Sequence, residues 1–142
     1  MTGFVVDASV AVKWLVAEAY SEQAARLLES DRVLIAPALL YAEAANALWA
    51  LARRGDIAAA DVGDALAVLA DAPLTVPSSL RRLMPAAARL AVDLGPPVFD
   101  CFYLALALQE QLPVVTADRL FHDTVRAHPY LADRIVHIAD IG

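Results

Sequence analysis

The sequence predicts an α/β fold, an α/β/α sandwich with a short central parallel sheet. Short apolar segments alternate with helical ones throughout the chain, and the apolar segments have no polar face. Both observations are typical of strands that helices cover on both sides. Apolar residues make up 60% of the chain, with alanine prominent among them, which favours a helix-rich body. The length of 142 residues fits one domain, so we expect a single domain over residues 1–142.

The first third of the chain predicts two strands and two helices. Residues 4–6 form an apolar run, which predicts a short buried strand, and residues 8–16 follow as a helix. Ser21 is a favourable N-cap for a second helix over residues 21–28. A turn then leads into residues 33–36, which predict a second buried strand.

The middle of the chain predicts two helices and a third strand. Pro37 opens a long helix that runs to Arg54, and Gly55 ends it. Residues 57–70 carry a second helical pattern. Residues 74–76 form a short segment between two prolines, which predicts the third strand.

The last third of the chain is punctuated by prolines and glycine. Residues 78–84 fit either a short helix or a loop. Pro85 fits the first position of a helix that ends at Leu94 and Gly95. The elements expected after it are a helix over 100–111, a strand over 113–115, a helix over 118–126 and a strand over 135–138.

The net charge and the lone cysteine restrict the class of protein. The formal net charge is −6, which argues against a protein that coats nucleic acid, since such proteins are normally basic. An acidic enzyme whose metal ions screen its site remains compatible with this charge. Cys101 is the single cysteine, so the chain forms no internal disulfide, which fits a reducing compartment.

The apolar segments also bear on location. None approaches the roughly 20 residues that span a bilayer. The N-terminus has no charged region before its first apolar run, so we do not expect a secretory signal. We therefore expect no membrane association and a cytoplasmic protein.

Four acidic residues lie where carboxylates are hardest to keep ionised. Asp7 follows the first predicted strand and Asp118 follows the fourth. Asp100 opens a predicted helix, and Glu43 stands inside the segment 39–52, which is otherwise apolar apart from Asn46. Because sites in open α/β sheets form beyond the carboxyl ends of the strands, we expect these acids to form one cluster, with Glu43 reaching into it sideways.

A cluster of this kind is costly unless a cation holds it. Two like charges about 4 Å apart repel by about 4 kcal/mol at an effective dielectric near 20, and a domain is stable by only about 5–15 kcal/mol. Either some carboxyl groups are protonated or a divalent cation binds, and all-oxygen ligands select Mg²⁺ or Mn²⁺. We therefore expect a set of residues that are both metal ligands and catalytic: Asp7, Glu43, Asp100 and Asp118. One or two such ions activate water and steady the leaving oxygen of a phosphodiester.

Three polar neighbours are candidates for a supporting role. The hydroxyls of Ser9 and Thr116 lie close in sequence to Asp7 and Asp118, where they can orient a ligand carboxylate or a metal-bound water. Asn46 lies three residues after Glu43 and shares its helix face.

Each acid also has a purely structural interpretation. Asp is a favoured N-cap, and Asp7, Asp100 and Asp118 each precede a predicted helix. Glu43 lies past the first turn of its helix, so its structural alternative is a salt bridge to an arginine. The conjunction of all four in an α/β alternation is more specific than any one of them.

The residues resemble those of a known family. The chain resembles PIN-domain proteins, specifically the VapC toxins of bacterial toxin–antitoxin pairs, over nearly its whole length. The stretches that carry the resemblance are 5–9 (VVDAS) followed by Lys13-Trp14, 43–48 (EAANAL), 98–107 (VFDCFYLALA) and 115–118 (VTAD).

This resemblance implies a PIN-like fold and an Mg²⁺- or Mn²⁺-dependent endoribonuclease, made as a homodimer and held inactive by a cognate antitoxin protein. The family's four acids fall on the four already named, and its hydroxyl beside the last acid falls on Thr116. Cys101 stands where the family often has alanine, which should matter little. Family members often have a further acid near the last motif, for which Asp123 is available, although a surface position fits it better.

Basic residues near these motifs are candidates for contacts with the RNA substrate. Lys13 lies six residues after Asp7, within the predicted helix over 8–16, and Arg81 and Arg82 form a basic pair. The alternative for the arginines is a solvated face or surface salt bridges.

Other functions compete with the nuclease. A phosphatase of the haloacid dehalogenase type needs a second Asp two residues after the first, where this chain has Ser9. A receiver-type phosphoacceptor module that binds Mg²⁺ needs an acidic pair after the first strand and a lysine after a later one, and Lys13 is the only lysine. A PIN-domain nuclease of RNA processing without a toxin role stays open, and the short chain favours the toxin.

Overall fold

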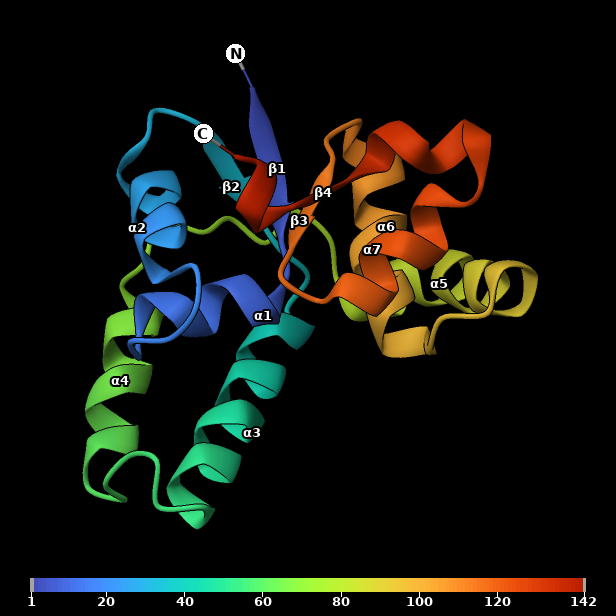
Figure 1. The fold of residues 1–142 in the computed structure, drawn as a ribbon. Coiled ribbons are helices and arrows are strands. Elements are labelled where there is room, and N and C mark those ends of the chain that lie inside the picture. The colour runs from blue at the N-terminus through green and yellow to red at the C-terminus, as the bar shows by residue number, and fades with distance from the viewer. Residues whose placement is uncertain (1, 142) are drawn as a thin grey trace.

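A four-stranded parallel sheet forms the centre of the molecule (Figure 1). The computed structural model describes residues 2–141. The strands are β1 (Gly3–Val6), β2 (Val33–Ile35), β3 (Val114–Thr116) and β4 (Ile135–His137), in the order β2-β1-β3-β4. The register pairs Val5 with Val114 and Val6 with Val115, so β1 and β3 run side by side and end at the same edge.

Helices flank this sheet, as expected for the predicted sandwich. They are α1 (Ala8–Ala11), α2 (Ser21–Glu29), α3 (Leu39–Arg53), α4 (Asp61–Ala70), α5 (Leu80–Leu94), α6 (Val98–Glu110) and α7 (Arg119–Arg126), with short 3-10 turns η1 (Val12–Trp14), η2 (Pro129–Arg134) and η3 (Ile138–Asp140). In Figure 1 α2 lies on one side of the sheet and α5 and α6 on the other. α6 packs against β1, β3 and α5, while α3 and α4 pair as a hairpin that leads away from the sheet.

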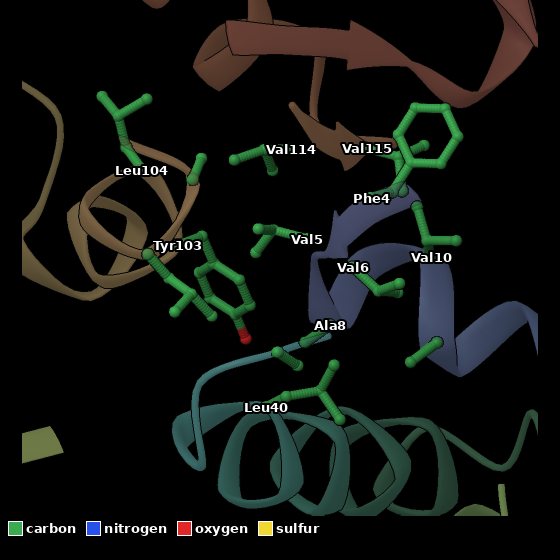
Figure 2. Packing of buried hydrophobic residues seen from close by; sticks show 14 of the residues in the cluster. Phe4, Val5, Val6, Ala8, Val10, Leu40, Tyr103, Leu104, Val114 and Val115 are labelled. Carbon is green, nitrogen blue, oxygen red and sulfur yellow. The ribbon is translucent and has the colours of Figure 1, made fainter. Parts of the chain in front are cut away.

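The two central strands are buried along their whole length, which confirms that both faces of the sheet are covered. Val5, Val6, Val114 and Val115 are fully buried. Figure 2 shows their side chains packed between α1, α3 and α6. Tyr103 of α6 lies in the same core with its ring fully buried and its hydroxyl pointing toward α3 (Figure 2).

The third predicted strand, over residues 74–76, is wrong. Only Thr75 forms a bridge there, opposite Ile35. Its N–H donates to Leu34 and its carbonyl accepts from Ala36, both at 3.0 Å. A proline on each side limits the segment, because proline has no N–H to extend a ladder.

The prediction that Pro85 begins a helix is also wrong. α5 begins earlier, at Leu80, because Ser79 caps it by accepting a hydrogen bond from the N–H of Arg82 at 3.1 Å. Pro85 therefore lies inside the helix, where its missing N–H leaves one carbonyl of the preceding turn without its helical donor. The predicted end is confirmed, since Gly95 closes α5 with a φ of 102°.

Three other predicted helix starts are shifted. The helix expected from residue 57 begins at Asp61, and the one expected from Pro37 begins at Leu39. The helix expected from Asp100 begins at Val98, which places Asp100 inside the first turn. The segment 8–16 forms α1 and then tightens into η1.

Within residues 2–141, no single helix has both the length and the hydropathy to cross a membrane. α5 and α6 taken together meet that requirement by length and composition, but the two are bent by 113° at the break between them.

Two glycines allow a matched test of the packing between β1 and β2. A Cβ on Gly3 would lie 2.5 Å from the carbonyl oxygen of Val33, so we expect Gly3→Ala to destabilise the protein by about 1–3 kcal/mol. Gly63 lies in α4, where an added Cβ would meet no described atom within 4 Å, and we expect Gly63→Ala to stabilise by about 0.5–1 kcal/mol. Urea unfolding of both variants measures the two effects, and equal effects would contradict the described β1–β2 contact.

Candidate functional site

The candidate site lies at the carboxyl edge of the sheet, where β1 and β3 end. Asp7 follows β1 directly, and Asp118 lies two residues beyond the end of β3. The N–H of Asp7 donates to the carbonyl of Val115 at 3.0 Å, which ties the end of β1 to its neighbour. α1, α3 and α7 also begin at this edge (Figure 1), so the chain brings polar residues from several segments to one place.

Asp7 is held by two hydroxyl groups. Ser9 Oγ donates to Asp7 Oδ2 at 2.6 Å, and Thr116 Oγ1 donates to the same oxygen at 2.8 Å. The side chain is only 7% exposed, and this burial is the main reason that the pKa of the Asp7 carboxyl is raised. The two hydroxyl donors and the N–H of Ala8 work against that shift, while the charge of Asp118 adds to it. One carboxylate oxygen is thus committed to the protein.

The same two hydroxyls also fix the main chain after β3. Ser9 Oγ accepts from the N–H of Ala117 at 2.9 Å, and Thr116 Oγ1 accepts from the N–H of Asp118 at 3.0 Å. The hydroxyl oxygens lie 3.3 Å apart. The structure therefore brings Ser9 and Thr116 to Asp7, and they join the two strand ends that carry Asp7 and Asp118.

Glu43 extends from α3 and is held by a tyrosine of α6. Tyr103 Oη donates to Glu43 Oε1 at 2.6 Å. Partial burial is the main cause of the raised pKa of Glu43; the Tyr103 hydrogen bond opposes the shift and the charge of Asp7 increases it. Burial also raises the pKa of Tyr103 beyond its usual range, so its phenol remains protonated and a hydrogen-bond donor.

One feature of the sequence indicates that Tyr103 lies near the site. It lies three residues after Asp100, so the two residues share a face of the same helix. Its hydrogen-bond partner could not be read in this way, because Glu43 is 60 residues away along the chain.

Asp100 shows most directly that the acids lie near one another. It lies in the first turn of α6 and is partly buried. Its pKa is raised to about 7, first by burial and then by the charges of Asp7, Asp118 and Glu43. The other three acids, Asp7, Glu43 and Asp118, therefore all lie within electrostatic range of Asp100.

Helix capping accounts for only one of the three aspartates. Asp118 caps α7, since its Oδ1 accepts from the N–H of Phe121 at 3.1 Å, and the residue remains exposed. Asp7 occupies the N-cap position of α1 but makes no side-chain capping bond. Asp100 lies inside its helix and caps nothing. The structural interpretation is therefore insufficient for Asp7 and Asp100.

No basic residue in the described part of the chain neutralises this cluster. Within residues 2–141 the ion pairs are elsewhere, between Lys13 and Glu18, Arg54 and Asp56, and His122 and Asp123. The arginine partner that would explain Glu43 structurally is therefore absent from the described chain. An unneutralised set of carboxylate oxygens matches the ligand chemistry of hard divalent cations.

The carboxylates are not arranged as a closed coordination shell. Residues 2–141 contain no group of three or more His, Cys, Asp or Glu side chains positioned to hold a metal ion as they stand. The hydrogen bonds explain part of this, because Asp7 Oδ2 and Glu43 Oε1 are each engaged by hydroxyl donors. Each of these two side chains keeps a second oxygen, and carboxylate oxygens are the kind of donor that a hard divalent cation binds.

Asn46 lies beside Glu43, as its spacing predicts. It is exposed and makes no side-chain hydrogen bond to any other residue between 2 and 141. Together with Glu43 and the exposed side chain of Phe99 it lines a cavity of about 360 Å³. Asn46 therefore lies at the opening of the site and does not contact the other acids.

The basic residues predicted to contact RNA, and Asp123, make no described hydrogen bond or ion pair with the four acids of the cluster. The ammonium group of Lys13 is paired with Glu18 at 3.0 Å, although Lys13 and Ser9 line the same surface hollow. Arg81 and Arg82 are exposed on α5. Asp123 is exposed and contacts His122 at 2.8 Å, as expected of a surface residue.

Comparison with known proteins shows the family of the chain and two solved structures that share its fold. The family described as PIN domain matches residues 4–127. Among solved structures, PAE2754 from Pyrobaculum aerophilum has a TM-score of 0.68 at 24% identity, covering 97% of this chain and 90% of that one. VapC20 from Mycobacterium tuberculosis, described as a toxin that cleaves the sarcin–ricin loop, has a TM-score of 0.66 at 18% identity, covering 85% of this chain and 94% of its own. A search of curated proteins finds no match.

The raised pKa of Asp100 predicts that this acid destabilises the metal-free protein. Since its pKa of about 7 in the folded state exceeds the ordinary value of 3.8, the native state binds more protons than the unfolded state between these pH values. Stability therefore falls as the pH rises through this window. We expect Asp100→Asn to stabilise the metal-free protein at pH 8 by roughly 1 kcal/mol, a figure reduced for partial exposure, and the gain to shrink toward pH 4.

Urea unfolding in EDTA at several pH values checks this expectation. Asp64, an exposed acid in the first turn of α4, provides the matched control, and Asp64→Asn should give no such gain at pH 8. If Asp100→Asn were destabilising at pH 8, the described repulsion among the acids would be wrong.

Proposed function

The chain belongs to the PIN-domain family, whose members are nucleases, and from that premise we propose that it is a divalent-metal-dependent endoribonuclease. We further propose that it acts as the toxin of a toxin–antitoxin pair, as a cytoplasmic homodimer inhibited by a cognate antitoxin. The likeness to VapC20, a toxin that cleaves the sarcin–ricin loop, supports the toxin role.

One observation carries the nuclease proposal. Carboxylates from three other segments of the chain act on the charge of Asp100, and no basic side chain in residues 2–141 pairs with any of the four acids. Asp7 is buried and Glu43 and Asp100 are partly buried, and a charge that is taken out of water without a basic partner lowers stability. Binding of a hard cation would offset that loss.

The proposed ligands of Mg²⁺ or Mn²⁺ are Asp7, Asp100 and Asp118, with Glu43 either a fourth ligand or the group that positions the attacking water. A bound ion would supply an activated water and charge stabilisation at the leaving oxygen of a phosphodiester. Ser9 and Thr116 hold Oδ2 of Asp7, and no side chain in residues 2–141 donates to Oδ1. They thereby fix the direction in which that ligand oxygen points.

The same side chains suggest how the substrate approaches. Asn46 lies with Glu43 at the cavity that opens beside the cluster, where it can donate a hydrogen bond to a phosphate or a ribose. Lys13 adjoins Ser9 in the neighbouring hollow and would contact a phosphate once its pair with Glu18 opens. Arg81 and Arg82 are proposed as weaker, more distant phosphate contacts.

Purified protein provides the direct test of this chemistry. We expect cleavage of RNA in Mg²⁺ or Mn²⁺, its loss in EDTA, and its recovery when the ion is added back. Asp7→Asn should lower the rate by roughly 100-fold or more, since ion-borne charge stabilisation amounts to several kcal/mol. Asp123→Asn is the matched control and should cleave at the wild-type rate. Cleavage that persists in EDTA and in Asp7→Asn would remove the proposal.

The toxin role has a separate test in cells. Induced expression should arrest growth, and Asp100→Ala should relieve the arrest at the same protein level, because it removes a proposed metal ligand without a charge reversal. Protein amounts are compared by immunoblot. Full nuclease activity in vitro without growth arrest would favour an RNA-processing role over the toxin.

A further inference from the structure

We infer that Tyr103 is a positioning residue, whose buried hydroxyl holds the carboxylate of Glu43 inside the acidic cluster. This inference rests on the proposed nuclease site and names a residue of its supporting framework. It explains how a side chain on α3 joins acids that lie at the ends of β1 and β3.

The hydrogen bond from Tyr103 to Glu43 is short, and its donor is held in place by the core. Tyr103 Oη lies 2.6 Å from Glu43 Oε1, and Tyr103 is fully buried. Its ring packs in the core beside Val5 (Figure 2), so the hydroxyl has a fixed position. Because α6 also packs against β1 and β3, the donor is anchored to the same sheet that carries Asp7.

Glu43 needs such a donor because the other acids repel it. Its neighbours on α3, Ala42 and Asn46, are exposed, so solvent lies within reach of an extended glutamate side chain. The charges of Asp7 and Asp100 both act on it. Without a partner at Oε1, the side chain would turn outward, away from the cluster.

Tyr103 restrains Glu43 without neutralising it. A neutral hydroxyl donates one hydrogen bond and leaves the negative charge in place, whereas an arginine would cancel it. Oε1 is engaged, and Oε2 remains available to a cation or a water. Since Asp100 lies one turn earlier on α6, this single helix contributes one acid of the site and orients another.

Removal of the hydroxyl alone tests the inference. In the crystal structure of metal-free Tyr103→Phe we expect Glu43 to turn toward solvent, with the ring and the core unchanged. The affinity for Mn²⁺, measured by calorimetry, should weaken about 10- to 100-fold, as for other partners that orient a ligand. Tyr41→Phe is the matched control, because Tyr41 lies on α3 with Glu43, is partly buried and makes no side-chain hydrogen bond within the described chain.

A second variant separates positioning from general structure. Glu43→Asp keeps the charge but is too short to reach the hydroxyl, so it should lose a similar share of Mn²⁺ affinity. Tyr103→Phe added to Glu43→Asp should cause no further loss. An equal further loss in that background, or a Glu43 that stays in place in the Tyr103→Phe crystal, overturns the inference.

The outcomes also distinguish this inference from the proposed function. If the wild-type protein bound no Mn²⁺ and cleaved no RNA, the proposed function would fail. The position of Glu43 in the metal-free crystals of the wild type and of Tyr103→Phe would still decide the role of Tyr103.

Discussion

Repulsion between the carboxylates of Asp7, Glu43 and Asp100 is the constraint to which this end of the molecule is adapted. The protein meets it with neutral hydroxyl donors, from Ser9 and Thr116 at Asp7 and from Tyr103 at Glu43. Neutral donors stabilise an anion locally but leave its field intact, whereas basic partners would cancel it. The cluster therefore keeps its negative potential, which is the property that a cation site requires. Repulsion among these acids lowers the free energy of unfolding at the proposed site, and the packing of the buried core compensates for that loss.

The fold makes the cluster possible because β1 and β3 end, and α1, α3 and α7 begin, at the same edge of the sheet. β1 and β3 are adjacent and parallel, so the residues that follow them meet without any long loop. α6 packs across both strands and adds Asp100 from its first turn, and α3 approaches from the side with Glu43. Acids that are separated along the sequence thus become neighbours through short connections. Because the elements that carry them are packed into the core, their positions are fixed.

The sequence revealed the parts of this arrangement that depend on local pattern. Apolar runs located β1, β2, β3 and β4, and adjacency placed Ser9 and Thr116 near their acids. The sequence patterns did not predict features for which two local preferences compete, namely the start of α5 and the extent of the expected third strand. At Leu80 the cap from Ser79 outweighs the preference of Pro85 for a first turn, and the flanking prolines reduce the expected third strand to the bridge at Thr75. The bond from Tyr103 to Glu43 was invisible because only tertiary packing brings those residues together.

The register of the central strands has a consequence for how the protein matures. Val6 pairs with Val115, and Asp7 follows Val6 directly. The position of Asp7 is therefore set by the register of β1 against β3. A slip of one residue would exchange the faces of β1 and turn Asp7 away from the hydroxyl of Thr116. Partly assembled or misaligned chains would consequently lack the proposed site, which forms only after the sheet has closed in the correct register.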